Sequence, residues 1–488
     1  MAAQPTTRVQ VSGYRFLVRR MEHALVRRDV RMLHDPMRSQ SRAMTVGAVV
    51  AVVGLAACAA LALVRPQDRI GDAPIVVGKD SGAMFVALGD TLHPALNLAS
   101  ARLISGSSAA PVTVKESELG SRPRGALVGI PGAPSALPDG ELSSWSVCDT
   151  LDAGGNRVVS TAVLGVDPVL GEQAAALTDS QALLARGSGG VFLVRAGTRS
   201  RVDLDDHAVS LAFGLDGVEP RPVSAGLLAA IPEAPALTPP QIDGRGELPS
   251  YSLGGKTVGS VVQVRGAGET AFYVLLRGGL QRVGQATADL IRYSDSQGDA
   301  ATDTVTPDLV SRLPRSEDLA VSSFPLEAPE IVGSAGSPVS CLSWKPVPGA
   351  EEAPGGLRAS ISVIAGNALP LPDGARPVVL AQADGTGENA DSAYLRPGSG
   401  GLVHSTGVTP TSERSGALFF VADTGVRFGI ENAEAAKALG FSAPGSPAPW
   451  QILSLLASGP TLARQAAFLA HDGVAPDDHP VAVSDPAR

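Results

Sequence analysis

The residues Gly254-Gly-Lys-Thr257 form the part of this chain that most resembles a site for phosphate chemistry. In a phosphate-binding loop, glycine-rich backbone surrounds the phosphates and a lysine contacts them, so this order of residues suggests nucleotide binding. The pattern is incomplete, because its first glycine would fall on Ser250. We therefore expect these residues to form a glycine-rich turn before a strand.

A second group of reactive side chains lies at residues 203–207. Asp203, Asp205 and Asp206 offer the oxygen ligands that calcium prefers, but the glycine and the closing glutamate of an EF-hand loop are missing. Asp206 and His207 would also be ordinary at the exposed start of a helix. The sequence contains no HExxH motif, no metal-spaced Cys/His cluster and no GxSxG motif. We expect no catalytic residue, no metal and no cofactor.

The chain also contains three cysteines. Cys58 ends Leu55-Ala-Ala-Cys58, which resembles a lipoprotein processing box, but the apolar sequence continues to Val64 and argues against cleavage there. Cys148 and Cys341 are the other two, and they are expected to form a structural disulfide in an oxidising compartment. Such a bridge would contribute roughly 5 kcal/mol at most to the free energy of unfolding. No CxxC motif indicates a redox-active pair.

The surroundings of these two cysteines mirror each other. Trp145 precedes Cys148 by three residues, and Trp344 follows Cys341 by three residues. This arrangement predicts two related halves that meet at the disulfide, with both tryptophans in the core beside it.

Residues 43–64 form an uncharged apolar run of 22 residues. At about 1.5 Å per residue, a helix of this length spans roughly 33 Å, which matches the hydrocarbon core of a bilayer. A secretory signal peptide has a shorter apolar region and a shorter leading segment than the 42 residues found here. We expect a permanent single-pass transmembrane helix.

The charges beside this run predict its orientation. Nine arginines and three acidic residues precede it, and subtracting them from the 39 basic and 48 acidic residues of the chain leaves 30 and 45. Because basic segments stay in the cytoplasm, the N-terminus is expected inside and the acidic remainder outside the plasma membrane. An acidic ectodomain also argues against nucleic-acid binding.

The N-terminal segment has the pattern of an amphipathic helix. Ser12 could cap its start and Pro36 could end it. One face is apolar and the opposite face is rich in arginine. The apolar stripe consists of Tyr14, Leu17, Val18, Met21 and Leu25. Such a helix could lie on anionic lipid or dock onto a protein, and both interpretations fit the spacing.

A short hydrophobic strand that ends in valine recurs four times. Its final residues are Val86, Val194, Val274 and Val421. A glycine-bearing turn follows each copy, and eleven residues after each valine comes a polar residue expected to open a helix: Asn97, Asp205, Gln285 and Asn432. Proline-bearing turns are expected at 130–137, 231–237, 313–319 and 456–462. Strand, turn, helix and proline turn thus form a module repeated four times.

Extra sequence separates some of the modules. The valines are 108, 80 and 147 residues apart, and the two longer gaps contain Cys148 and Cys341. We expect an elongated α+β ectodomain in which four repeats surround a split central β domain with pseudo-twofold symmetry. The expected parts are a cytoplasmic segment (1–42), a transmembrane helix (43–64), repeat 1 (65–141), the first central part (142–182), repeat 2 (183–245), repeat 3 (246–332), the second central part (333–400), repeat 4 (401–472) and a C-terminal tail (473–488).

The segments Gln10-Val-Ser-Gly-Tyr-Arg-Phe-Leu-Val-Arg-Arg20 and Ala24-Leu-Val-Arg-Arg-Asp29, the membrane span, the four repeats and the cysteine pair resemble the EccB family of type VII (ESX) secretion systems. The resemblance covers essentially the whole chain. It implies a periplasmic repeat body, self-association, and assembly with the motor ATPase EccC and the membrane subunits EccD and EccE. It also favours protein docking by the N-terminal helix.

These observations predict a structural scaffold of a protein secretion complex, not an enzyme. The alternative is a membrane-tethered module that binds peptidoglycan, since repeated small lobes suit that use. Only 19 aromatic residues occur in the chain, which limits the surface for stacking on sugars.

Overall fold

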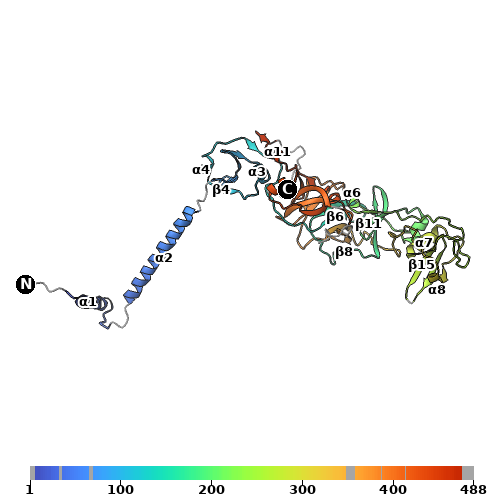
Figure 1. Ribbon diagram of the computed structural model, residues 1–488, viewed down its shortest axis with the longest axis horizontal. Helices are drawn as coiled ribbons and strands as arrows, with labels where there is room; N and C mark the ends of the chain where they lie inside the picture. The colour runs from blue at the N-terminus through green and yellow to red at the C-terminus, as the bar shows by residue number, and fades with distance from the viewer. Residues whose placement is uncertain are drawn as a thin grey trace, which may run out of the picture. The chain divides into compact units, whose positions relative to one another are not determined.

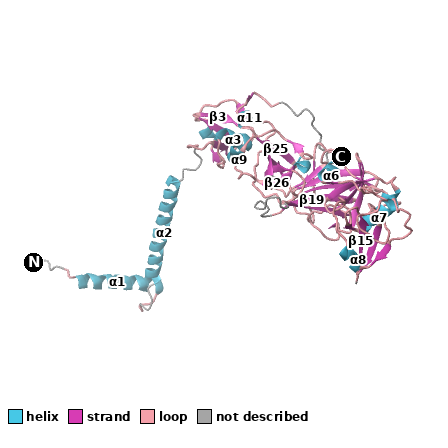
Figure 2. Cartoon of the chain, turned by 45° about the vertical axis from the view of Figure 1, so that its right-hand side comes forward, coloured by secondary structure: helices cyan, strands magenta, loops and turns pink. Residues whose placement is uncertain are grey.

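The computed structural model describes residues 6–31, 36–64, 70–266, 268–347, 358–385, 387–412 and 414–474. Residues 475–488 of the expected tail lie outside these ranges. The chain divides into two compact units, Met1–Gly71 and Asp72–Arg488 (Figure 1). Helices make up the described part of the first unit, whereas strands dominate the second (Figure 2). The mixed α+β class expected from the sequence is confirmed.

The first unit contains α1 (Arg8–Arg27) and α2 (Pro36–Val64). Thr7 caps α1, because its side chain accepts a hydrogen bond from Gln10 N while the Gln10 side chain accepts one from the Thr7 N–H. The expectation that Ser12 caps this helix is therefore wrong. Pro36 does not end α1 but begins α2, since proline fits the first helical turn, where its missing N–H has no helical partner.

Within α2, Ser39–Leu61 is long and apolar enough to cross a membrane, and none of its most apolar window is buried. The span Ser39–Leu61 begins four residues before the span 43–64 expected from the sequence.

The second unit contains four small sheets of one topology, which we call modules 1 to 4. Module 1 consists of β1 (Ile75–Gly78), β2 (Met84–Leu88), β3 (Thr91–Pro94), α3 (Leu98–Ser105), β4 (Val112–Val114) and α4 (Glu116–Leu119). Module 2 consists of β9 (Gln181–Gly187), β10 (Gly190–Arg195), β11 (Thr198–Val202), α5 (His207–Ala212), β12 (Arg221–Pro222), α6 (Ala225–Ala230) and β13 (Glu233–Ala234).

Modules 3 and 4 have the same order of elements. Module 3 consists of β14 (Val261–Arg265), β15 (Thr270–Leu275), β16 (Leu280–Val283), α7 (Gln285–Ser294), β17 (Asp303–Val305) and α8 (Pro307–Arg312). Module 4 consists of β23 (Gly400–Thr406), β24 (Arg414–Ala422), β25 (Val426–Ile430), α9 (Ala433–Leu439), β26 (Ser446–Pro449), α10 (Trp450–Leu453) and β27 (Ala457–Ser458).

In every module the first three strands form an antiparallel meander, and the fourth returns beside the first in parallel. A fifth segment then runs parallel to the third strand, as β13 in module 2 and β27 in module 4. In module 1 this contact consists of two isolated bridges, Leu92 to Arg124 and Ala95 to Val128, and in module 3 it consists of the bridge from Leu280 to Arg315. Each module thus contains more strands, and a second helix, than the strand, turn and helix expected from the sequence.

The four anchoring valines all lie in the second strand of a module. A third strand separates the glycine turn from the helix in each case. Asn97 and Asn432 cap α3 and α9 as expected. In module 2 the cap is Asp206 instead of Asp205, because the Asp206 carboxylate accepts the N–H groups of the first turn.

The modules also differ from the expected pattern at one helix start and at one proline turn. Gly284 is the N-cap of α7, so Gln285 is already the first residue of that helix. The carbonyls of Pro232 and Pro314 accept hydrogen bonds from the third strands of modules 2 and 3. In module 1 the equivalent acceptor is Pro123, so the proline turn expected at 130–137 was misaligned.

A seven-stranded sheet lies between the modules in sequence. Its strands are β6 (Trp145–Leu151), β7 (Val158–Leu164), β8 (Ala174–Ala176), β19 (Val339–Pro346), β20 (Ala359–Gly366), β21 (Val378–Val379) and β22 (Ser392–Tyr394). The order is β21-β22-β7-β6-β19-β20-β8. The antiparallel ladder of β6 and β19 therefore joins two hairpins that are far apart in sequence.

Helices connect the modules in pairs. Helix α3 packs on α9, α5 packs on α7, and α6 packs on α10. Module 1 shares a hydrophobic core with module 4, and module 2 shares one with module 3. The largest core lies where α6 and α10 cover one face of the central sheet.

Four further short elements lie in the described part of the second unit: β5 (Leu127–Val128), β18 (Glu330–Ile331), α11 (Arg464–Ala467) and β28 (Ala470–His471). Strand β28 pairs with β5, and the His471 ring lies 2.9 Å from the Gly129 carbonyl. Strand β18 pairs with β9 of module 2. The last described residues are therefore tied to module 1.

Candidate interaction surfaces and the central junction

The disulfide joins the middle strands of the central sheet. Cys148 on β6 lies directly opposite Cys341 on β19, with 4.0 Å between their Cα atoms, and the two are bonded. Both are buried under Ala162, Ile364 and Tyr394. The disulfide expected from the sequence is confirmed.

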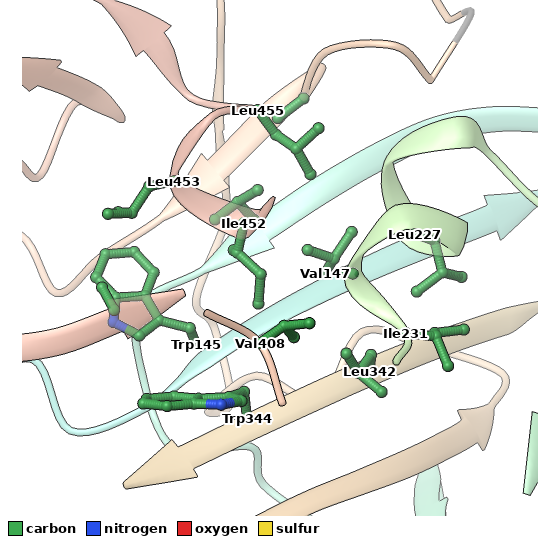
Figure 3. Close-up of a cluster of buried hydrophobic side chains, with 14 of the residues drawn as sticks. Trp145, Val147, Leu227, Ile231, Leu342, Trp344, Val408, Ile452, Leu453 and Leu455 are labelled. Carbon is green, nitrogen blue, oxygen red and sulfur yellow. The ribbon is translucent and has the colours of Figure 1, made fainter. Parts of the chain in front are cut away.

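The tryptophans occupy the other face of the same ladder. Trp145 pairs with Trp344 three positions along from the cysteines, and an odd offset on a strand reverses the side-chain direction. Both indoles are buried with Val147, Leu342 and the residues of α6 and α10 (Figure 3). The mirrored spacing in the sequence is what an antiparallel ladder requires. The tryptophans thus lie across the sheet from the disulfide, not beside it.

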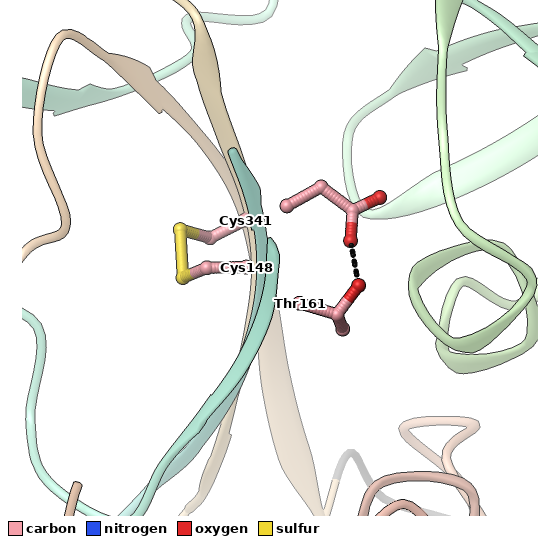
Figure 4. The surroundings of a disulfide bond; sticks show 4 residues. Cys148, Thr161 and Cys341 are labelled. Carbon is pink, nitrogen blue, oxygen red and sulfur yellow. Dashed lines mark hydrogen bonds between the residues drawn. A yellow bond between two sulfur atoms is a disulfide. The ribbon is translucent and has the colours of Figure 1, made fainter. Parts of the chain in front are cut away.

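A buried carboxylate lies on this face. Asp149 Oδ1 accepts a hydrogen bond from Thr161 Oγ1 at 2.8 Å, and its Oδ2 accepts one from Ser224 N at 2.6 Å. Ser224 caps α6, so the central sheet holds the start of a module 2 helix. Figure 4 shows the disulfide on one side of the strands and Thr161 on the other.

Burial shifts the pKa of both ionisable groups at this junction, Asp149 and Arg221. Burial raises the pKa of Asp149, against the effect of its hydrogen bonds from Ser224 and Thr161 and of the nearby Arg221. Arg221 is also buried, and burial lowers its pKa to about 10 although Asp149 opposes the shift. Arg221 Nη2 donates to the Ser337 carbonyl at 2.5 Å.

A second carboxylate extends the junction. Asp391 accepts hydrogen bonds from the backbone N–H groups of Thr161, Asp384 and Gly385. Sequence reasoning missed both acids. One signal was present, because alternation on β6 places Asp149 on the same buried face as Trp145.

The Gly254–Thr257 segment does not have the geometry of a phosphate-binding loop. Lys256 Nζ contacts Asp299 Oδ1 at 2.8 Å and Asp303 Oδ2 at 2.6 Å. Burial opposes charge there, but the two carboxylates prevail and raise the pKa of Lys256. The next element is strand β14, whereas a phosphate-binding loop leads into a helix. The lysine therefore serves as an internal counter-ion.

The acidic group at 203–207 forms a helix start. The Asp206 carboxylate accepts the N–H groups of Ala208 and Val209, and Asp203 accepts the N–H of Asp205. His207 is exposed as the first residue of α5. Within the ranges that the structure describes, no group of three His, Cys, Asp or Glu residues could hold a metal.

The apolar stripe of α1 faces solvent in the first unit. Tyr14, Leu17, Met21 and Leu25 are exposed, and Val18 is half-buried. Cys58 lies within α2, in the apolar window that could span a membrane. These side chains are available for contacts outside the chain.

Module 4 presents one exposed tryptophan. Trp450 is 43% exposed and stacks on Phe419 with 5.7 Å between the ring centres. The Arg427 guanidinium lies 5.1 Å from the Trp450 ring. Trp145 and Trp344, by contrast, are buried.

Comparison with known proteins gives a family match over nearly the whole chain. The model of the family described as "Type VII secretion system ESX-1, transport TM domain B" matches residues 3–476. The chain belongs to the EccB family. It is 42% identical over 482 residues to the ESX-3 secretion system ATPase EccB3 of Mycolicibacterium smegmatis, covering 96% of this chain and 91% of that protein.

Solved EccB structures show the same fold. A chain of the intact ESX-5 inner membrane complex matches with a TM-score of 0.75 and 33% identity over 99% of both chains. The EccB3 dimer from the ESX-3 core complex matches with a TM-score of 0.72 and 37% identity, covering 81% of this chain and all of that one. EccB proteins are components of ESX inner membrane complexes, and the family assignment expected from the sequence is confirmed.

Proposed function

We propose that this EccB protein is a structural subunit of a type VII secretion complex in the plasma membrane. The observation that carries the proposal is the likeness to a chain of the intact ESX-5 inner membrane complex over 99% of both chains. The membrane helix at Ser39–Leu61 would anchor it. The nine arginines before the helix favour a cytoplasmic N-terminus, and the disulfide suits an oxidising periplasm.

The two units would make different contacts. The exposed stripe of α1 would dock onto cytoplasmic parts of the complex, with the EccC motor ATPase as the expected partner. The second unit would associate with further copies of itself and with EccD and EccE, consistent with the EccB3 dimer among its structural relatives.

Copurification from the native membrane tests this proposal. Leu17 and Met21 lie one helical turn apart on the apolar stripe, so Leu17→Glu with Met21→Glu would place two charges in the docking face. We expect the full-length wild-type chain in mild detergent to recover the motor ATPase and multispanning subunits, and the double variant to lose the ATPase.

Ser12→Glu is the matched control, because residue 12 lies on the opposite side of α1 and is also exposed. It should leave copurification unchanged. Recovery of the wild-type chain alone would contradict the scaffold role, whereas equal loss with both variants would contradict docking through the stripe.

We also infer that the chain contributes structure and does not hydrolyse ATP, although relatives carry the name ATPase. The engagement of Lys256 by Asp299 and Asp303 supports this inference. ATP turnover by the purified full-length chain that falls in Lys256→Gln would refute it.

The arrangement of modules supports a further part of the proposal, that two related halves build the second unit. Each half would run module, central hairpin, module, so that modules 1 and 3, hairpins β6–β7 and β19–β20, and modules 2 and 4 correspond. The cross-packing of α3 on α9 and of α5 on α7 supports this relation. The disulfide would then join equivalent cysteines near the pseudo-twofold axis.

Binding to peptidoglycan remains a second candidate function, favoured by the exposed ring of Trp450, which packs on the buried Phe419 and lies beside Arg427. Aromatic faces stack on sugar rings. If this surface binds glycan, the full-length protein should sediment with purified sacculi, and Trp450→Ala should reduce the bound fraction several-fold. Unchanged sedimentation of the variant would exclude Trp450 as the contact.

A further inference from the structure

The fifth segment of three modules follows the edge of the third strand over two successive contacts. The first contact is made at Leu92 in module 1, Arg199 in module 2 and Val426 in module 4. The second consists of the Ala95–Val128 bridge, the hydrogen bond from Leu237 N to Arg201 O, and the Ile430–Leu462 bridge. In each of these modules an extended part of the same chain therefore covers the sheet edge.

Among its described residues, module 3 makes only the first of these contacts. Leu280 N donates to Pro314 O, and Leu280 O accepts from Ser316 N. Further along, the side chain of Gln281 bonds to the main chain of Leu319, with Nε2 donating to Leu319 O at 2.7 Å and Oε1 accepting from Leu319 N at 2.8 Å. Leu319 ends the proline-bearing turn 313–319, just as Leu237 ends 231–237 and Leu462 ends 456–462. A side-chain amide thus replaces the main-chain contact.

The consequence is an uncovered residue on the edge of β16. Leu280 directs its N–H and C=O away from β15, and outward-facing residues alternate along an antiparallel strand, so Arg282 also directs its main chain outward. In the described parts of the chain, no backbone hydrogen bond pairs the N–H or C=O of Arg282 on that side. Such unpaired groups at a sheet edge are a template for another strand.

A cavity of about 870 Å³ lies along this edge. Its walls include Phe272 and Val283 from one face of the sheet and Ala271 and Leu280 from the other. Because neighbouring residues of a strand point to opposite faces, a cavity lined by both must follow the edge itself. The outer wall is the segment 315–327, in which Leu326 is 74% exposed.

We propose that this edge of module 3 binds an extended peptide segment of another protein chain. The peptide runs parallel to β16, between the strand and segment 315–327, and exchanges main-chain hydrogen bonds with Arg282. The occupant is inferred from the sister modules, in which an extended segment rich in alanine, proline and leucine fills the equivalent place. Addition of a strand to a sheet edge is a common mode of peptide recognition. The site goes beyond the scaffold role and does not depend on it.

A synthetic peptide that copies the fifth segment of module 2 is a suitable probe. Its sequence, Ile-Pro-Glu-Ala-Pro-Ala-Leu-Thr, corresponds to residues 231–238. We expect the fluorescein-labelled peptide to bind the full-length protein in detergent about tenfold more tightly than a scrambled peptide. A benzophenone-labelled form should cross-link to residues of β16 or segment 315–327. Saturation with the peptide should also slow hydrogen exchange of the Arg282 amide.

Two variants separate main-chain from side-chain recognition. Arg282→Pro removes the N–H donor and should abolish binding, whereas Arg282→Ala keeps the main chain and should retain it. Hydrogen exchange of the Arg282 amide is measured on the wild-type protein, so it still tests peptide binding at this edge if Arg282→Pro fails to fold. Binding no better than that of the scrambled peptide, cross-links elsewhere, or equal loss in both variants would overturn the proposal.

Discussion

At the scale of single residues, Asp149 links the central sheet to a module. Its two oxygens accept hydrogen bonds from Thr161 on the neighbouring strand and from Ser224 at the start of α6. A buried carboxylate loses its hydration, and hydrogen bonds recover only part of that free energy. Arg221 supplies a nearby positive charge without bonding to it directly. The junction therefore specifies how α6 sits on the sheet, while its stability depends on the ionisation of Asp149.

The raised pKa of Asp149 predicts a dependence of stability on pH. Because the native state binds the proton more tightly than the unfolded chain, the Asp149 contribution to the free energy of unfolding is complete below about pH 4. It is lost as the pH rises through the native pKa of Asp149. Asp149→Asn carries no proton in this range, so the wild-type minus variant difference in free energy of unfolding should decrease from pH 4 to pH 8. Urea unfolding of the full-length chain, followed by tryptophan fluorescence, measures it.

The difference curve is needed because other acids act in the opposite direction. The backbone and side-chain hydrogen bonds from Ser81 lower the pKa of Glu116 to about 2, so its contribution is lost as the pH falls. Both proteins share that effect. Asp149→Ala should cost about 2–4 kcal/mol near pH 4, since it leaves the Ser224 N–H and the Thr161 hydroxyl without an acceptor, and this cost should also shrink as the pH rises. A difference curve that is flat with pH would refute the ionisation of Asp149 as the cause.

The sequence predicted the cysteine pair but not the hydrogen-bond partners of Asp149. The cysteine pair was predictable because only two cysteines lie outside the membrane segment, and their flanking tryptophans mirror an antiparallel ladder. The role of Asp149 was not, since its partners lie 12 and 75 residues away and only folding brings them together. The face of the tryptophans was also misjudged, although strand alternation contained that information.

At the scale of elements, the repeated valines revealed the modules because the second strand is their most regular part. The fourth strand escaped detection because it is two to four residues long and follows loops of unequal length. Periodicity cannot identify so short a strand. The second helix was missed for the same reason, since α4 and α10 each contain four residues.

The contact between α6 and Leu455, two residues after α10, gives a prediction at this scale. A Cβ on Gly226 would lie 2.9 Å from the Leu455 side chain and 3.2 Å from the Gly387 carbonyl, and Leu455 is buried. Gly226→Val should therefore lower the free energy of unfolding by about 2–3 kcal/mol through overpacking. Ala229→Val adds the same branched side chain at an exposed position of the same helix and should cost about 0.5 kcal/mol. Equal effects in urea unfolding would show that α6 has room at this contact.

At the scale of the whole molecule, the disulfide encloses a large part of the second unit. Cys148 and Cys341 are 193 residues apart, and modules 2 and 3 lie entirely between them. Modules 1 and 4 lie outside this loop yet share one hydrophobic core. Force applied to the chain ends therefore reaches modules 1 and 4 first, while modules 2 and 3 stay protected by a covalent bond.

Single-molecule pulling on the full-length chain tests this arrangement. With the disulfide intact, complete extension should be shorter by roughly 70 nm than in the Cys148→Ala, Cys341→Ala double variant, because each enclosed residue adds about 0.36 nm. The double variant should also unfold more readily in urea, by up to about 5 kcal/mol. Cys58→Ala is the matched control, since Cys58 is free and should change neither length nor stability. Equal contour lengths for the wild-type chain and the double variant would mean that Cys148 and Cys341 are not bonded in the native protein, and the two central hairpins would then be held together by their strand ladder alone.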